Sequence, residues 1–192
     1  MKILFIGNSY TYFNDMPKIL ERICRENDID LATDSVVKGG YTLAHFLSLD
    51  NEYGVRAHAL LSSEKYDYVV LQEQSVRPAE HPETFYNSVR ELAALIRENG
   101  AKLVLYETWA RADGSETLDA LGWSHDTMRE KLKKAYENAA KENNAILVYA
   151  GERFDEAYKA GEPVYDPDKS HPSPTGTKIV AEEFFRTLMN KT

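Results

Sequence analysis

The sequence predicts an α/β fold of three layers, in which a five-stranded parallel sheet carries helices on both faces. Short apolar runs alternate with segments of helical periodicity along all 192 residues. Most of these runs are continuously apolar, as expected for strands that are covered on both faces. No linker, repeat or low-complexity tract interrupts the alternation, so we expect residues 1–192 to form a single domain.

The predicted strands are short, and each is followed by polar residues. They span Lys2–Ile6, Leu31–Val37, Tyr66–Leu71, Lys102–Glu107 and Ala145–Tyr149. Right-handed crossovers between successive strands make the sheet parallel, which brings the carboxyl ends of the strands to one edge. Open α/β sheets bind their ligands beyond that edge.

Helical periodicity fills the intervals between the strands. Apolar residues recur at helical spacing over Met16–Ile23, Phe85–Ile96, Met128–Ala139 and Gly176–Leu188. Ser173 is the predicted cap of the last helix, and Pro174 is its first residue. Residues 108–125 form the longest stretch without clear periodicity, and a loop of that length is often functional.

Composition narrows the range of partners. The net charge of −8 argues against nucleic acid or an anionic membrane surface, since both require basic patches. Cys24 is the single cysteine, so no internal disulfide can form. No apolar run approaches the roughly 20 residues that span a bilayer, and "MKILFIG" is too short for a signal peptide. These features favour a cytoplasmic protein.

A candidate nucleophile follows the first predicted strand, in "GNSYT" at residues 7–11. Small polar residues there are usually turn formers or helix caps. A serine hydroxyl becomes a nucleophile when a base and an orienting group accompany it. His171 and Asp168, in "DPDKSHPSP" at residues 166–174, could act on Ser9 in those roles. The aspartate would orient the imidazole directly or through the backbone of the turn.

Acyl transfer also needs hydrogen-bond donors for the oxyanion of the tetrahedral intermediate. The backbone N–H of Ser9 is one candidate. Gly40, in a Gly-Gly pair after the second strand, lets the backbone approach a ligand closely. Gln72 and Gln74 follow the third strand and carry amide donors.

These segments, in this order, resemble the blocks of the SGNH (GDSL-type) hydrolase superfamily, from Gly7 to the last helix. "GNSYT" matches the family's "GDS" block, with Asn8 where the family usually has Asp. "GGYT" matches the glycine block at Gly40, and "DKSH" matches the family's "DxxH". The resemblance implies a flavodoxin-like fold and a Ser9–His171–Asp168 triad with no metal or organic cofactor.

The third block departs from the family pattern. "QEQS" at residues 72–75 stands where the family has "GxND". A simple alignment places Gln74 at the asparagine position, where its amide could still donate. Gln72 is the alternative, because some acetyl-sugar esterases of the superfamily carry a "QGE"-type block there. Both glutamines remain candidates for the side-chain donor of the oxyanion hole.

The resemblance implies a serine esterase acting on a small-molecule ester. Asn8 and His45 are predicted to line the substrate site, together with residues of the 108–125 loop, namely Trp109, Arg111, Trp123 and His125. Aromatic faces stack on sugar rings, and arginine binds carboxylates or hydroxyls. No long apolar lid is evident, so removal of acetyl groups from a carbohydrate or glycoside is the preferred activity.

Several other functions stay open. Lysophospholipases and thioesterases of the same superfamily hydrolyse other acyl groups. The altered third block is compatible with a binding domain that has kept the fold and lost catalysis. An enzyme of another class would bind a metal through Asp166, Asp168 and His171 and would act on a phosphoester. The sequence contains no second cluster with ligand spacing.

Overall fold

A five-stranded parallel sheet forms the centre of the computed structural model, which describes residues 1–189. The strand order is β2-β1-β3-β4-β5, which confirms the predicted fold class. The strands are β1 (Lys2–Gly7), β2 (Ala32–Val37), β3 (Tyr68–Leu71), β4 (Lys102–Tyr106) and β5 (Ile146–Val148). Each lies within two residues of its predicted bounds.

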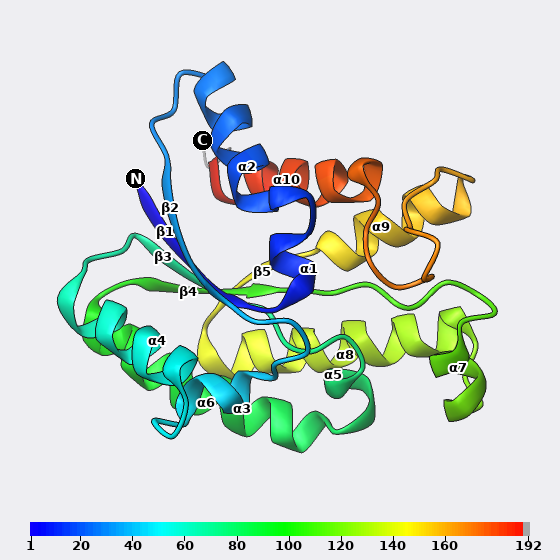
Figure 1. Cartoon of the computed structure of the whole chain (residues 1–192), viewed down its shortest axis with the longest axis horizontal. Coiled ribbons are helices and arrows are strands. Elements are labelled where there is room, and N and C mark those ends of the chain that lie inside the picture. Colours follow the sequence, from blue (N-terminus) through cyan, green and yellow to red (C-terminus); the bar gives the residue numbers. More distant parts are fainter. Residues whose placement is uncertain (190–192) are drawn as a thin grey trace.

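Helices cover both faces of the sheet (Figure 1). One face carries α2 (Met16–Glu26), α9 (Ala150–Lys159) and α10 (Pro174–Met189). The other carries α3 (Leu43–Leu47), α4 (Glu52–Ser63), α6 (Pro82–Asn99) and α8 (His125–Asn143). Shorter elements lie in the connections, namely α1 (Ser9–Tyr12), η1 (Phe13–Asp15), α5 (Arg77–Glu80) and α7 (Glu116–Leu121).

Strand β1 shows why the sheet holds its helices on two sides. Ile3 and Phe5 are fully buried against the layer of α2, α9 and α10. Leu4 and Ile6 are fully buried in the opposite core. Burying each such side chain contributes about 1.5–3 kcal/mol. A continuous apolar run is therefore the sequence of a strand that packs on both faces.

The predicted loop over residues 108–125 is partly helical, which corrects the expectation of an irregular segment. Ser115 accepts a hydrogen bond from Leu118 N–H and caps α7, and Gly122 ends this helix with a φ of 63°. The short helix offers too few residues for a periodic pattern to be recognised from the sequence.

The strand order makes the carboxyl end of β1 the switch point of the sheet. Strands β2 and β3 lie on opposite sides of β1, so the connections diverge at its carboxyl end. Ligands of such sheets bind at this switch point. The turn that follows β1 contains Ser9.

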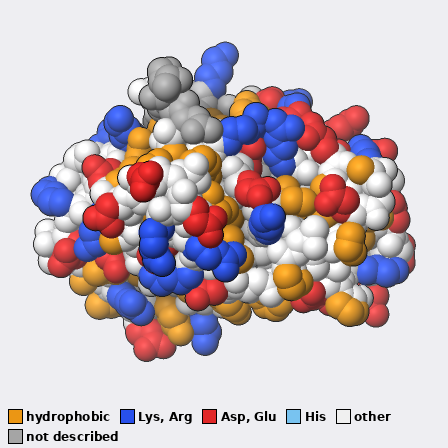
Figure 2. Space-filling model, turned by 90° about the horizontal axis from the view of Figure 1, so that it is seen from above, with side chains coloured by type: hydrophobic (Ala, Val, Ile, Leu, Met, Phe, Trp, Pro, Cys, Tyr) orange, Lys and Arg blue, Asp and Glu red, His pale blue; other side chains and the backbone are white. Residues whose placement is uncertain are grey.

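Charges of both signs are interspersed over the face that α2 and α10 form (Figure 2). In the part of the chain that the structure describes, no helix combines the length and apolar character required to cross a bilayer.

Candidate active site

The turn after β1 is shaped by close packing against Gln72. A Cβ atom on Gly7 would lie 2.7 Å from Gln72 Oε1 and 2.8 Å from Thr11 Oγ1, so only glycine fits there. Asn8 caps α1 by accepting a hydrogen bond from Tyr10 N–H through its side chain. Ser9 is therefore the first residue of α1, with its N–H at an uncompensated helix start.

Ser9, His171 and Asp168 form one hydrogen-bonded row. Ser9 Oγ lies 2.8 Å from His171 Nε2, and His171 Nδ1 lies 2.5 Å from Asp168 Oδ2. Because a carboxylate only accepts, Nδ1 carries the proton of the neutral ring and Nε2 is left to accept that of Ser9. This is the arrangement in which a histidine can deprotonate a serine.

The second oxygen of Asp168 organises the loop that carries the histidine. Asp168 Oδ1 accepts hydrogen bonds from the backbone N–H groups of Ser170 and His171, so both orienting routes considered from the sequence occur together. Burial alone would raise the pKa of Asp168. The hydrogen bonds from the His171 ring and from the two N–H groups outweigh it and keep this pKa below its usual value.

Trp109 lies in the core and contacts the loop that carries His171, so it is not a substrate contact, contrary to the prediction. Its side chain is fully buried and stacks between Tyr10 and Phe154, with ring centroids 4.4 and 4.2 Å away. Trp109 Nε1 donates to the Ser170 carbonyl oxygen at 3.0 Å. The tryptophan thus fixes the residue that precedes His171.

Aromatic residues of α1 and η1 contact the imidazole itself. The Phe13 ring stacks on His171 with a centroid distance of 4.1 Å. Tyr10 meets the imidazole edge-on and shares a 2.9 Å hydrogen bond with Ser170 Oγ. Sequence reasoning missed both residues. Their position directly after the nucleophile was the available signal, because α1 must pack against whatever Ser9 contacts.

Gly40 adopts a left-handed conformation with a φ of 75°. It lies at the edge of a cavity that Ser9 and His171 also line. Neither the Ser9 nor the Gly40 N–H donates to a protein acceptor within residues 1–189. Asn8 also lines the cavity, but its side chain is almost fully buried, and its Nδ2 donates to the Tyr41 carbonyl oxygen at 2.9 Å. Asn8 thereby ties the glycine loop to β1.

The two glutamines of the third block have different environments. Gln72 is fully buried, accepts from Asn8 N–H and Thr11 Oγ1, and donates to the Glu73 carbonyl oxygen. Gln72 does not line the cavity around Ser9, so the structure favours Gln74 over Gln72 as the side-chain donor for the oxyanion.

Gln74 lines the cavity instead. Its Oε1 accepts from the N–H groups of Val76 and Arg77, which turns its Nε2 toward Ser75 Oγ at 3.4 Å. This amide nitrogen has donor capacity left for a ligand.

Glu73 links the third block to the helix that follows the glycine loop. Its Oε1 accepts from Leu43 N–H at 3.1 Å and from Gln74 N–H at 2.6 Å. Burial raises the pKa of Glu73 to about 7, and these two hydrogen bonds only partly offset the effect.

His45 does not belong to the lining of the cavity, which corrects another prediction. Its Nδ1 accepts from Thr42 N–H in a capping box at the start of α3, and its ring stacks on Tyr41. Trp123 packs partly buried in the core below the sheet, with Lys131 Nζ 4.9 Å from its ring centroid. Local packing therefore explains both side chains.

The candidate site is a cavity of about 170 Å³ at the carboxyl edge of the sheet. Larger hollows of about 410 and 520 Å³ lie between α9 and α10 and between α4 and α6, and neither contains Ser9 or His171. Side chains and backbone from each sequence block meet in the smaller cavity. Its lining comprises Asn8, Ser9, Tyr10, Gly40, Gln74, Ser75, Arg111, Ser170 and His171.

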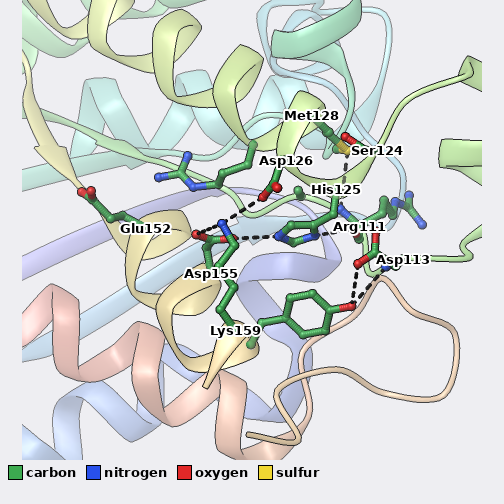
Figure 3. A network of polar contacts seen from close by, with 12 residues as sticks. Arg111, Asp113, Ser124, His125, Asp126, Met128, Glu152, Asp155 and Lys159 are labelled. Atoms are coloured by element: carbon green, nitrogen blue, oxygen red, sulfur yellow. Dashed lines mark hydrogen bonds and ion pairs between the residues drawn. The ribbon is translucent and has the colours of Figure 1, made fainter. Parts of the chain in front are cut away.

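The predicted metal alternative finds no matching cluster in residues 1–189. The group whose ligand atoms lie within 4.8 Å of one another is His125, Asp126 and Asp155, and it includes neither Asp166 nor Asp168. Lys159 Nζ lies 2.9 Å from Asp126 and 3.2 Å from Asp155, so an ammonium group already occupies the position between these carboxylates (Figure 3).

Solved structures with the same fold span almost the whole chain. A protein from Slackia heliotrinireducens assigned to the SGNH hydrolases is 33% identical, with a TM-score of 0.87 and 98% coverage of both chains. A DUF4886 family protein from Bacteroides uniformis is 19% identical, with a TM-score of 0.82, and the match covers 98% of this chain and 83% of the other.

An esterase is also among the similar structures. Axe2, an acetylxylan esterase from Geobacillus stearothermophilus, is 18% identical, with a TM-score of 0.70, and the match covers 97% of this chain and 93% of Axe2. No protein-family profile matches the sequence, and no curated protein matches it significantly.

Proposed function

The chain belongs to the SGNH hydrolase superfamily, and we propose that it is a serine esterase that uses Ser9, His171 and Asp168. One observation carries the proposal, namely the unbroken row of hydrogen bonds from Ser9 Oγ through the imidazole to Asp168. A serine that merely capped a helix would have no need of an oriented imidazole.

The reaction begins with attack of Ser9 Oγ on the ester carbonyl carbon. His171 Nε2 takes the hydroxyl proton as the new C–O bond forms, and Asp168 stabilises the resulting imidazolium. Collapse of the tetrahedral intermediate breaks the ester C–O bond, and His171 returns the proton to the leaving alcohol. Water then attacks the acyl-enzyme by the same sequence and releases the acid.

Three donors are proposed to stabilise the oxyanion. The N–H groups of Ser9 and Gly40 are free of protein acceptors in the described chain, and Gln74 Nε2 lies at the same cavity. Each such donor typically contributes about 2.7–4 kcal/mol to lowering the barrier. Gln74 thus takes the part that an asparagine has in the usual third block.

We further propose a small acyl group, with acetyl on a carbohydrate or glycoside as the preferred substrate. The volume of about 170 Å³ supports a short acyl chain over the long chain of a lysophospholipid. Since Trp109 is buried, the stacking argument made from the sequence no longer supports a sugar. The remaining support is the shared fold with an acetylxylan esterase.

A panel of p-nitrophenyl esters with acyl chains of two to twelve carbons tests this proposal, followed by acetylated sugars. We expect the highest kcat/KM for acetyl and a steep decline with chain length. A preference for long chains would favour a lysophospholipase or thioesterase activity and would contradict the acetylesterase proposal.

A further inference from the structure

We propose that Arg111 recognises a carboxylate on the substrate, close to the scissile ester. The natural substrate would then be an acidic ester rather than a neutral one. The inference rests on the proposed esterase function, because the carboxylate is defined by its position relative to Ser9. It begins from the cavity itself, in which Arg111 is the one arginine or lysine of the lining and no aspartate or glutamate contributes.

The Arg111 guanidinium is incompletely satisfied by the protein. Nη2 donates to Ser75 Oγ at 3.0 Å, whereas Nε is buried and has no hydrogen-bond partner in residues 1–189. Within the same described residues, no carboxylate lies in ion-pair distance of this side chain. Arg129, by contrast, is buried against Glu107 at 2.8 Å.

A buried donor without a partner costs about 1–3 kcal/mol, and a charged one costs more. Nε is closed to the cavity, so a substrate carboxylate would instead accept from the Nη groups, of which Nη2 alone has a protein acceptor in the described chain, and would supply the missing opposite charge. Guanidinium and carboxylate also match in geometry, since the planar fork donates two parallel hydrogen bonds. An arginine that lines the cavity with Nη donors to spare and, among the described residues, no carboxylate partner therefore has what a carboxylate site requires before its ligand binds.

Two side chains of α8, His125 and Met128, contact the main chain of Arg111 (Figure 3). His125 Nδ1 donates to the Arg111 carbonyl oxygen at 2.7 Å, and Arg111 N–H points to Met128 Sδ at 3.5 Å. His125 is buried, and its Nε2 lies 2.8 Å from Asp155 Oδ1. A side chain that projects from a fixed backbone loses less conformational freedom on binding, which favours recognition.

The size of the cavity limits how far the carboxylate can lie from the ester. Arg111 and Ser9 line the same cavity of about 170 Å³, so a carboxylate bound by Arg111 lies close to the ester that Ser9 attacks. The carboxylate therefore belongs to the acyl part, as in a half-ester of a dicarboxylic acid, or to the adjoining alcohol part, as in an acetylated uronic acid. A local cation is needed in either case, because the net charge of −8 repels anions at long range.

Pairs of ligands that differ only in charge distinguish these sources. Succinate is compared with succinamide and glucuronate with glucuronamide, each titrated into the wild-type protein and followed by NMR or calorimetry. Hydrolysis is measured in parallel on monomethyl succinate against methyl succinamate, and on acetylated glucuronic acid against its amide. Arg111→Gln removes the charge and Arg111→Lys keeps it. Arg90→Gln, at an exposed position on α6, is the matched control.

We expect wild type and Arg90→Gln to prefer the acid over the amide by roughly tenfold to a hundredfold in at least one pair. Arg111→Gln should abolish this preference and Arg111→Lys should keep part of it. Equal binding of acid and amide in both pairs, or a preference that survives Arg111→Gln, would overturn the inference. Arg111-dependent binding without hydrolysis of any ester would remove the esterase proposal and leave carboxylate recognition standing.

Discussion

Ser9 Oγ and His171 Nε2 lie 2.8 Å apart, although 162 residues separate them in the chain. Ser9 follows the first strand, and His171 precedes the last helix. Helix α10 packs beside α2, the helix that follows the Ser9 turn (Figure 1). This packing holds the segment that carries His171 next to the segment that carries Ser9. The geometry of the active site therefore depends on the packing of α10 against α2, to which the catalytic side chains do not contribute.

Substitution of Trp109 is expected to lower both the unfolding free energy and kcat. Trp109→Phe keeps a ring in the stack but leaves the Ser170 carbonyl oxygen without its donor, which should cost about 1–3 kcal/mol. The shifted His171 loop should also lower kcat, by up to about a hundredfold. Urea unfolding and ester kinetics measure the two effects. Trp123→Phe is the control and should leave kcat unchanged; an equal effect of both variants would contradict the role given to Trp109.

Substitution of Gln74 should lower kcat, whereas substitution of Gln72 should lower stability. Gln74→Glu keeps the oxygen that accepts from Val76 and Arg77 but replaces the amide donor with negative charge. Kcat should fall about 10²–10³-fold with little change in unfolding free energy.

Gln72→Ala should instead lower stability, because it leaves the buried Asn8 N–H unpaired. The opposite pattern, with Gln72 affecting kcat alone and Gln74 affecting stability alone, would exchange their roles.

Asn8 should not tolerate the aspartate that the superfamily usually has at this position. Asn8→Asp keeps the cap of α1 but sets a carboxylate against the Tyr41 carbonyl oxygen, to which the amide now donates. The glycine loop should move away, and kcat should fall about tenfold or more. Asn8→Ser, which caps without charge, should retain more activity. A fully active Asn8→Asp enzyme would show that this contact does not position Gly40.

Glu73 should make stability depend on pH. Its pKa rises from 4.5 to about 7 on folding, so the folded state binds more protons between these values. The unfolding free energy of the wild type should therefore decrease as pH rises from 4.5 to 7, by up to about 3 kcal/mol. Glu73→Gln lacks this decrease, and exposed Glu26→Gln retains it. A difference between wild type and Glu73→Gln that is constant from pH 5 to 8 would contradict the assignment.

The strands and the polar blocks at their ends could be predicted because each leaves a local signal. Continuous apolar runs marked buried strands, and the parallel topology then required their carboxyl ends to share an edge. The meeting of "GNSYT" with "DKSH" follows from that topology together with the family resemblance. The proximity of Ser9 and His171 thus needed no knowledge of side-chain packing.

The roles of Trp109, His45 and Gln72 could not be predicted, because they depend on which way a side chain points. A tryptophan after a strand can face the ligand or the core, and Trp109 faces the core because Tyr10 and Phe154 provide a stack for it. His45 is used by the cap of its own helix. Gln72 and Gln74 stand two residues apart, yet Gln72 is fully buried and Gln74 lines the cavity.

Covalent labelling with a fluorophosphonate probe tests the central claim most directly, because the probe reacts with a serine that an adjacent base activates. Intact-protein mass spectrometry should show one adduct on the wild type and none on Ser9→Ala. His171→Ala should label far more slowly, and both variants should lose about 10⁴–10⁶ in kcat. An unlabelled wild type, or a Ser9→Ala protein that still reacts, would contradict a nucleophilic role for Ser9.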